Sequence, residues 1–186
     1  MSANVAHMTL FTIGHSIRTL ADFTAMLAAA GIDCVVDVRR FPHSRRHPHF
    51  NTESLAKALP DAAIEYRPVE ALGGRRGRGA VSSPNTLWRE ETFRNFADYA
   101  ETPEFRAALE ALLDLASKRR VAIMCAEAVW WRCHRRIIAD YAIASGAEVV
   151  HILDKGKLEP ARLTEGAVPR ADGTILYTAD QARLPL

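Results

Sequence analysis

Residues 121–146, VAIMCAEAVWWRCHRRIIADYAIASG, contain the pattern that decides the fold. Val121 to Cys125 is apolar at every position, which predicts a strand covered on both faces, because a half-exposed strand would alternate with polar residues. After a short linker, Trp131 to Ser145 has the pattern of a helix that Gly146 would end. A buried strand followed by a helix is the building unit of α/β proteins.

The same unit recurs near the N-terminus. Thr9 to Ile13 is a short apolar run rich in β-branched residues, which predicts a strand. Thr19, with Asp22 three residues later, is typical of a helix start, and Gly31 is placed to end that helix. Cys34 to Val38 is again almost wholly apolar, which predicts a second buried strand.

Further strand and helix signals continue the alternation. Strands are expected at Ala63 to Tyr66 and Glu148 to Ile152, and helices at Thr52 to Leu59 (stopped by Pro60), Glu90 to Ala100 and Pro103 to Ser117. This order predicts an α/β fold with an open, mostly parallel sheet and helices on both faces, a Rossmann-like three-layer arrangement. We expect a single domain over residues 1–186, with the motifs in about 9–152 and the tail, 153–186, packed on it.

The composition is that of a folded chain without a membrane segment. Of its 186 residues, 48% are hydrophobic and 25% are charged, which is ordinary for a globular protein. No run approaches the roughly 18 apolar residues of a membrane helix, and residues 1–8 lack the pattern of a secretory signal. The three cysteines are an odd number, which argues against a disulfide scaffold. We therefore expect a cytoplasmic protein without a membrane partner, whose oligomeric state does not follow from the sequence.

Reactive side chains follow the predicted strands. In a parallel sheet the carboxyl ends of the strands share one edge, and α/β proteins bind their ligands there. The sequence therefore predicts one site at that edge. Its candidates, in strand order, are Gly14, His15, Ser16, Asp37, Arg39, Arg40, Tyr66, Cys125, Glu127 and His151.

Two short motifs, Cys125-Ala126-Glu127 and Cys133-His134-Arg135, flank the start of the helix in the opening stretch. Unpaired backbone N–H groups and the helix dipole favour an anion there, and Arg135 adds a full charge. The same field would lower the pKa of a nearby thiol. The cysteines are alternatively packing residues, and a zinc site would need His134 or a distant ligand, because no Cys-x-x-Cys is present. We predict no metal and no cofactor.

The most basic stretch is Arg39 to Phe50, RRFPHSRRHPHF, with four arginines, three histidines and no acid. Arginine recognises phosphate through paired hydrogen bonds, so the stretch predicts an anionic ligand, although it is alternatively a solvated loop. Asp37 lies in an apolar strand and needs a partner, for which Arg39 and Arg135 are candidates. A second basic loop contains three further arginines, Arg75, Arg76 and Arg78.

Several motifs, in order along the chain, resemble the uncharacterised domain-of-unknown-function family numbered 488. They are Thr12 to Ser16, Val36 to Arg39 with Pro42, Ser44 and Arg45, Tyr66 with Leu72 to Gly74, Met124 to Glu127, Cys133 to Arg135, and Val150 to Ile152. The resemblance spans about Thr9 to Ile152. It implies no reaction, because the family has no settled activity. It marks as site residues His15, Asp37, Arg39, Ser44, Arg45, Cys125, Glu127, Cys133, His134 and Arg135.

These residues leave three hypotheses about function. The first is that the protein is an enzyme that acts on a phosphate-bearing substrate, a nucleotide or a nucleic acid. The substrate-binding candidates are Arg39, Ser44, Arg45, Tyr66, Cys133 and Arg135. The catalytic candidates are Glu127 or Asp37 as acid or base, His15 or His134 as assistants, and Cys125 as a nucleophile. The absence of a G-x-G-x-x-G or Walker loop argues against a standard dinucleotide or nucleoside-triphosphate site.

The other two functions use the same residues differently. One is a nucleic-acid-binding module without catalysis, in which the loops Arg39 to Phe50 and Gly73 to Gly79 hold backbone phosphates and Trp130 or Trp131 stacks on a base. The other is a metal-dependent site built from cysteine and histidine.

Overall fold

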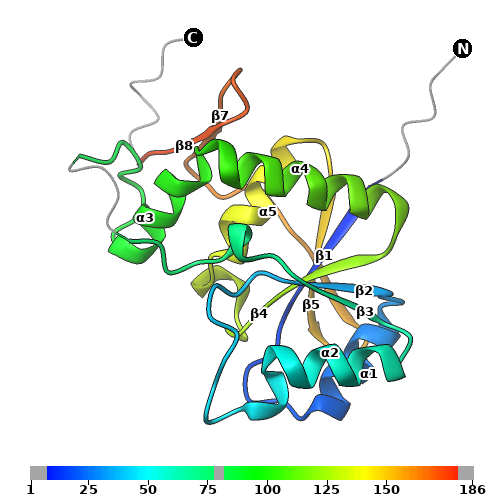
Figure 1. Ribbon diagram of the computed structural model, residues 1–186. Coiled ribbons are helices and arrows are strands. Elements are labelled where there is room, and N and C mark those ends of the chain that lie inside the picture. Colours follow the sequence, from blue (N-terminus) through cyan, green and yellow to red (C-terminus); the bar gives the residue numbers. More distant parts are fainter. Residues whose placement is uncertain (1–7, 78–81, 180–186) are drawn as a thin grey trace, which may run out of the picture.

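A six-stranded sheet in the order β3-β2-β4-β1-β5-β6 forms the centre of the molecule (Figure 1). The computed structural model describes residues 8–77 and 82–179. The strands are β1 Thr9–Gly14, β2 Cys34–Asp37, β3 Glu65–Pro68, β4 Val121–Cys125, β5 Glu148–Asp154 and β6 Lys157–Pro160. β1 to β5 are parallel and β6 pairs antiparallel with β5, so the predicted open, mostly parallel sheet is confirmed.

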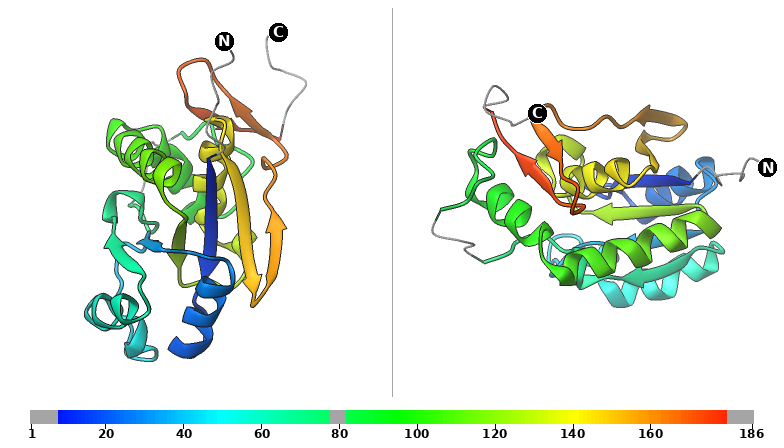
Figure 2. Two further views of the ribbon diagram at one scale, coloured as in Figure 1. Left: turned by 90° about the vertical axis from the view of Figure 1, so that its right-hand side faces the viewer. Right: turned by 90° about the horizontal axis from the view of Figure 1, so that it is seen from above.

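Helices cover both faces of the sheet, as predicted (Figures 1 and 2). The helices are α1 Leu20–Ala29 and α2 Thr52–Asp61 on one face, and α3 Glu91–Ala100, α4 Pro103–Lys118 and α5 Arg135–Ala144 on the other. Successive side chains of β4 enter different cores: Val121 packs with α4 and α5, whereas Ala122 packs with α1 and α2. A strand buried on both faces has no polar positions to alternate with, which explains its continuous apolar sequence.

Local signals of the sequence are satisfied at α1. The Thr19 side chain accepts a hydrogen bond from the backbone N–H of Asp22, at 3.1 Å, which caps the helix. Gly31 has a φ of 66°, the left-handed conformation that glycine adopts without steric cost. The predicted helix bounds are therefore correct at both ends of this element.

Other predicted bounds are wrong, each for a local reason. α5 begins at Arg135 rather than near Trp131, because Trp130–Arg132 forms a separate 3-10 turn and Cys133 is extended, with φ −128° and ψ 144°. Pro60 lies inside the last turn of α2 instead of stopping it, since its fixed φ suits a helix. β3 starts two residues late, because Ala63 turns the chain with a φ of 57°.

The prediction that His151 follows the last parallel strand is wrong. His151 lies within β5, because the strand continues to Asp154. The segments after β6 form a two-stranded antiparallel sheet, β7 Ala167–Pro169 and β8 Ile175–Tyr177. The side chains of Ile175 and Tyr177 are fully buried in the core beside α5. Within the described ranges, no helix combines the length and the apolar character that crossing a membrane requires.

Candidate functional site

A pocket of about 410 Å³ lies at the carboxyl ends of β1, β2 and β4. Its lining includes seven of the residues that the sequence marks, His15, Arg39, Ser44, Cys125, Glu127, Cys133 and His134. Four others, Asp37, Arg45, Tyr66 and Arg135, lie outside the lining. The pocket therefore unites residues that are far apart in the chain, as the parallel topology requires.

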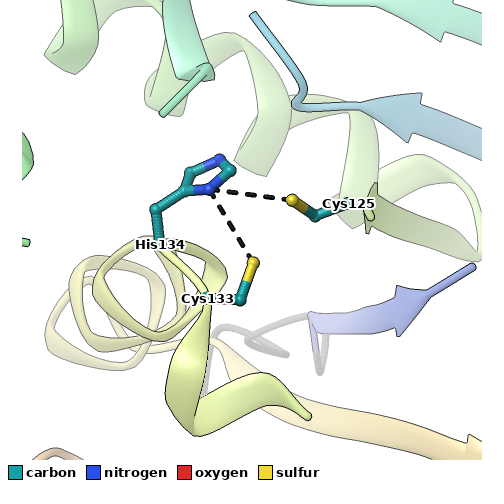
Figure 3. A group of neighbouring side chains, drawn as sticks. All are labelled: Cys125, Cys133 and His134. Atoms are coloured by element: carbon teal, nitrogen blue, oxygen red, sulfur yellow. Dashed lines mark hydrogen bonds between the residues drawn. The ribbon is translucent and has the colours of Figure 1, made fainter. Parts of the chain in front are cut away.

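Cys125, Cys133 and His134 point toward one another on one side of this pocket (Figure 3). Cys125 is the last residue of β4, whereas Cys133 and His134 directly precede α5. The Nδ1 atom of His134 lies 3.8 Å from the Cys125 sulfur and 3.7 Å from the Cys133 sulfur. We call these three residues the thiol–imidazole cluster.

The orientation of the His134 ring follows from its second nitrogen. Nε2 lies 2.8 Å from the backbone carbonyl oxygen of Val38. A carbonyl oxygen only accepts hydrogen bonds, so Nε2 carries the hydrogen and donates it. In the neutral ring, Nδ1 then keeps a lone pair, and that lone pair faces the two sulfurs.

The two thiols ionise differently. Burial opposes ionisation of Cys133, but a hydrogen bond from Cys125 and the interactions with His134 and Arg135 outweigh it, so the Cys133 pKa is well below the usual value. Arg135 also donates from Nε to the Cys133 sulfur at 3.3 Å. The hydrogen bond to Cys133, together with burial, raises the pKa of Cys125 well above its usual value. Of the two thiols, Cys133 is therefore the one that ionises more readily.

The guanidinium group of Arg135 is buried and hydrogen-bonded to protein atoms, so it is not available to bind a ligand. Its side chain is only 1% exposed, and Nη2 donates to the carbonyl oxygen of Glu127 at 2.7 Å. Gly14 makes room for this contact, because a Cβ on Gly14 would lie 1.8 Å from the same oxygen. Arg135 therefore holds the loop that presents Glu127, whose exposed side chain belongs to the pocket lining.

Asp37 is also satisfied internally. It is fully buried, and Arg39 binds both of its carboxylate oxygens, from Nε at 2.8 Å and from Nη2 at 2.6 Å. Tyr66 donates its hydroxyl to the same carboxylate at 2.6 Å. Burial, together with the negative charge of Asp37, raises the pKa of Tyr66. Of the two candidate partners for Asp37, the structure pairs it with Arg39, and the charge of Arg39 is balanced by this ion pair.

His15 contributes a neutral ring to the pocket. Its Nδ1 donates to the carbonyl of Ser16 at 2.9 Å, so Nε2 accepts from Arg39 at 3.2 Å. Burial lowers the pKa of His15 from 6.5 to about 4, and the Arg39 charge acts in the same direction. The ring stacks on Phe50 with 4.2 Å between centroids, which fixes its position.

The basic stretch is a shaped loop near the pocket mouth. The backbone N–H of Ser44 donates to Asn51 at 2.7 Å, and the Ser44 hydroxyl accepts from the backbone of His47 at 3.1 Å. Ser44 thereby lines the pocket, whereas Arg45 is exposed outside its lining.

Sequence reasoning missed part of the lining. Arg132 carries no sequence signal, and Arg75 is predicted only as one cation of the second basic loop rather than as part of the site. Both line the pocket with no side-chain partner among residues 8–77 and 82–179. Phe96, on α3, belongs to the core and also meets the His134 ring edge-on, with 4.9 Å between the ring centroids. No sequence signal separates these roles, because a buried aromatic residue has the same helical spacing in either.

The remaining marked groups are structural or lie elsewhere. Arg76 stacks on Tyr99 at 3.7 Å and donates to two backbone carbonyls. Trp130 stacks on His151 at 4.4 Å, and Trp131 is 49% exposed. Arg78 lies outside the described residues.

Residues 19–142 match the family model described as Domain of unknown function DUF488. The matched segment contains Asp37, Glu127 and the whole thiol–imidazole cluster, and His15 lies just before it. No curated protein and no solved structure matches the chain.

Proposed function

The chain belongs to the DUF488 family, as its motifs predicted, and we propose that it is an enzyme acting on a phosphate-bearing substrate, a nucleotide or the end of a nucleic acid. The observation that carries the proposal is a charge arrangement. Arg75 and Arg132, whose side chains have no partner within the described part of the chain, line the same pocket as the Glu127 carboxylate and the thiol–imidazole cluster. Unpaired cations beside acid–base and soft donor groups suit an anionic substrate.

Each of these groups has a separate role in the proposed reaction. Arg75 and Arg132 hold the anion, a role for which Arg39 and Arg135 are less suited because both are bound to protein groups. Glu127 serves as general acid or base, because its carboxylate is accessible and its backbone is held by Arg135. The pocket volume of about 410 Å³ is within the range of small-molecule sites.

The cytoplasm is the proposed compartment. All three cysteines are free, and the cluster needs Cys125 and Cys133 in the reduced form. Reduced thiols are maintained in the cytosol, whereas oxidising compartments favour disulfides.

Turnover of phosphate-bearing probes tests the proposal. Nucleoside mono-, di- and triphosphates, dinucleotides and short oligonucleotides would be incubated with the wild type and with Glu127→Gln. We expect at least one class to be converted, and Glu127→Gln to lose about 100-fold or more in turnover while binding the probe within a few-fold of the wild type. The matched control is Glu110→Gln, an exposed acid on α4 outside the pocket. Equal turnover by both variants would contradict the role of Glu127.

A second candidate function rests on two exposed aromatic residues, one of which lies in the basic stretch. Phe41 is 60% exposed and Trp131 is 49% exposed. The exposed guanidinium groups of Arg45 and Arg46 follow Phe41 closely in the chain. Aromatic platforms with adjacent cations bind single-stranded nucleic acid without catalysis. Binding of an oligonucleotide that weakens steeply with salt, with no conversion of any probe, would favour this function over the enzyme.

A further inference from the structure

We propose that Cys125, Cys133 and His134 bind a divalent metal ion that prefers sulfur and nitrogen ligands, with zinc as its representative. The two sulfurs and Nδ1 of His134 all lie within 4.8 Å of one another. Thiolate sulfur and neutral imidazole nitrogen are the commonest zinc ligands in proteins. Metal binding at these three residues does not depend on the proposed function.

The spacing of the cluster fits a tetrahedral ion. With a zinc–sulfur bond of about 2.3 Å and a zinc–nitrogen bond of about 2.05 Å, tetrahedral geometry separates sulfur from nitrogen by about 3.6 Å. The observed separations are 3.8 Å for Cys125 and 3.7 Å for Cys133. Both are long for a strong hydrogen bond to a ring nitrogen. The two sulfur–nitrogen separations therefore exceed the tetrahedral value by only about 0.1 to 0.2 Å.

Neighbouring groups already prepare the three ligands. The hydrogen bond from His134 to the Val38 carbonyl directs the Nδ1 lone pair at the sulfurs, and metal-ligating histidines use their second nitrogen in this way. Arg135 donates to the Cys133 sulfur, which favours its thiolate form. Two thiolates would balance the charge of a divalent ion, and the buried Arg135 would offset the charge of an unfilled site.

The placement of the cluster leaves one coordination position open. Its three residues all belong to the pocket lining, and the two cysteines are buried at its base between the pocket and the core. Three protein ligands with a fourth position open to water or substrate are typical of a catalytic zinc site, whereas structural zinc sites have four protein ligands. The catalytic role of the metal rests on the proposed function: in hydrolysis of a phosphate ester it would polarise the phosphoryl group, and Glu127 in the same pocket would accept a proton from the attacking water as the new P–O bond forms. That proton would then pass to the leaving oxygen as its P–O bond to the substrate breaks.

Metal content of the purified chain tests the site. Protein purified without chelator and equilibrated with Zn²⁺ would be analysed for bound zinc, and Co²⁺ would be titrated while the thiolate-to-cobalt charge-transfer absorption is recorded. We expect about one equivalent of metal in the wild type, and a more than about 100-fold loss of affinity in Cys133→Ser and His134→Gln. The matched control is Cys34→Ala, because Cys34 is free and fully buried but lies outside the pocket. It should bind metal like the wild type.

Three outcomes would overturn the site. The first is a wild type that retains no more zinc or cobalt than the variants. The second is a wild type in which Zn²⁺ fails to protect any thiol from a thiol-specific reagent, a test that does not depend on the folding of a variant. A disulfide between Cys125 and Cys133 that forms in the presence of excess zinc would also overturn it, in favour of a redox pair.

The two proposals fail separately. Zinc bound at the cluster without turnover of any phosphate probe would leave the metal site and remove the proposed function. Turnover by a chain that binds no metal would remove only the metal site.

Discussion

His134 donates from Nε2 to the carbonyl oxygen of Val38 at 2.8 Å, and this bond joins the start of α5 to the end of β2. It decides which ring nitrogen faces the sulfurs of Cys125 and Cys133. Because of this bond, the lone pair of Nδ1 and the two sulfurs face one another, as the ligands of a metal ion do.

Space beside the His134 ring provides the first prediction. A Cβ on Gly74 would lie 2.8 Å from Nδ1 of His134, so Gly74→Ala should displace the ring from the sulfurs. We expect the affinity for Co²⁺ to fall by about 10- to 100-fold, the range seen when the groups that orient metal ligands are disturbed. Gly77→Ala is the control, because its Cβ would meet no atom of the described residues within 4 Å. Equal cobalt affinities of the two variants would contradict the prediction.

The Asp37–Arg39 ion pair provides the second prediction. Asp37→Asn leaves the buried Arg39 without its counter-charge, which should lower the free energy of unfolding by about 3 to 5 kcal/mol. Asp114→Asn removes an exposed partner of Lys118 and should cost no more than about 0.5 kcal/mol. Urea unfolding measures both. A loss of less than about 1 kcal/mol in the unfolding free energy of Asp37→Asn would contradict the predicted stabilisation by the Asp37–Arg39 ion pair.

The buried histidines provide the third prediction. Burial lowers the pKa of both His15 and His151 from 6.5 to about 4. Between these values the unfolded chain binds more protons than the folded chain, so the free energy of unfolding should fall as the pH decreases from 6.5 to about 4. Above pH 6.5 the contribution is fully present.

Substitution separates this effect from other acid titrations. His15→Phe keeps a ring to stack on Phe50 and should reduce the pH slope of the unfolding free energy by about one proton. Phe41→Leu, at an exposed side chain that carries no titratable group, should leave the slope unchanged. Urea unfolding at several pH values measures both, and identical slopes for wild type and His15→Phe would refute the prediction.

Much of the fold followed from local patterns. Continuous apolar runs such as Val121 to Cys125 predicted strands buried on both faces, and the Thr19 cap predicted the start of α1. The predicted element boundaries are wrong where the backbone conformation differs from that of the predicted element, as at Cys133 and Ala63. Strand order put His15 and Cys125 at one edge, because parallel strands end together.

By itself, the sequence determined the α/β layers and the edge at which the chemistry gathers, since both depend on hydrophobic periodicity and chain direction. Only the tertiary structure decided what each polar group does. Arg39 and Arg135 are held by protein atoms, while Arg75 and Arg132 have no side-chain partner among the described residues. The physical reason is that hydrogen bonds and ion pairs depend on distance in space, and a contact such as His134 to Val38, 96 residues apart, leaves no periodic trace in the chain.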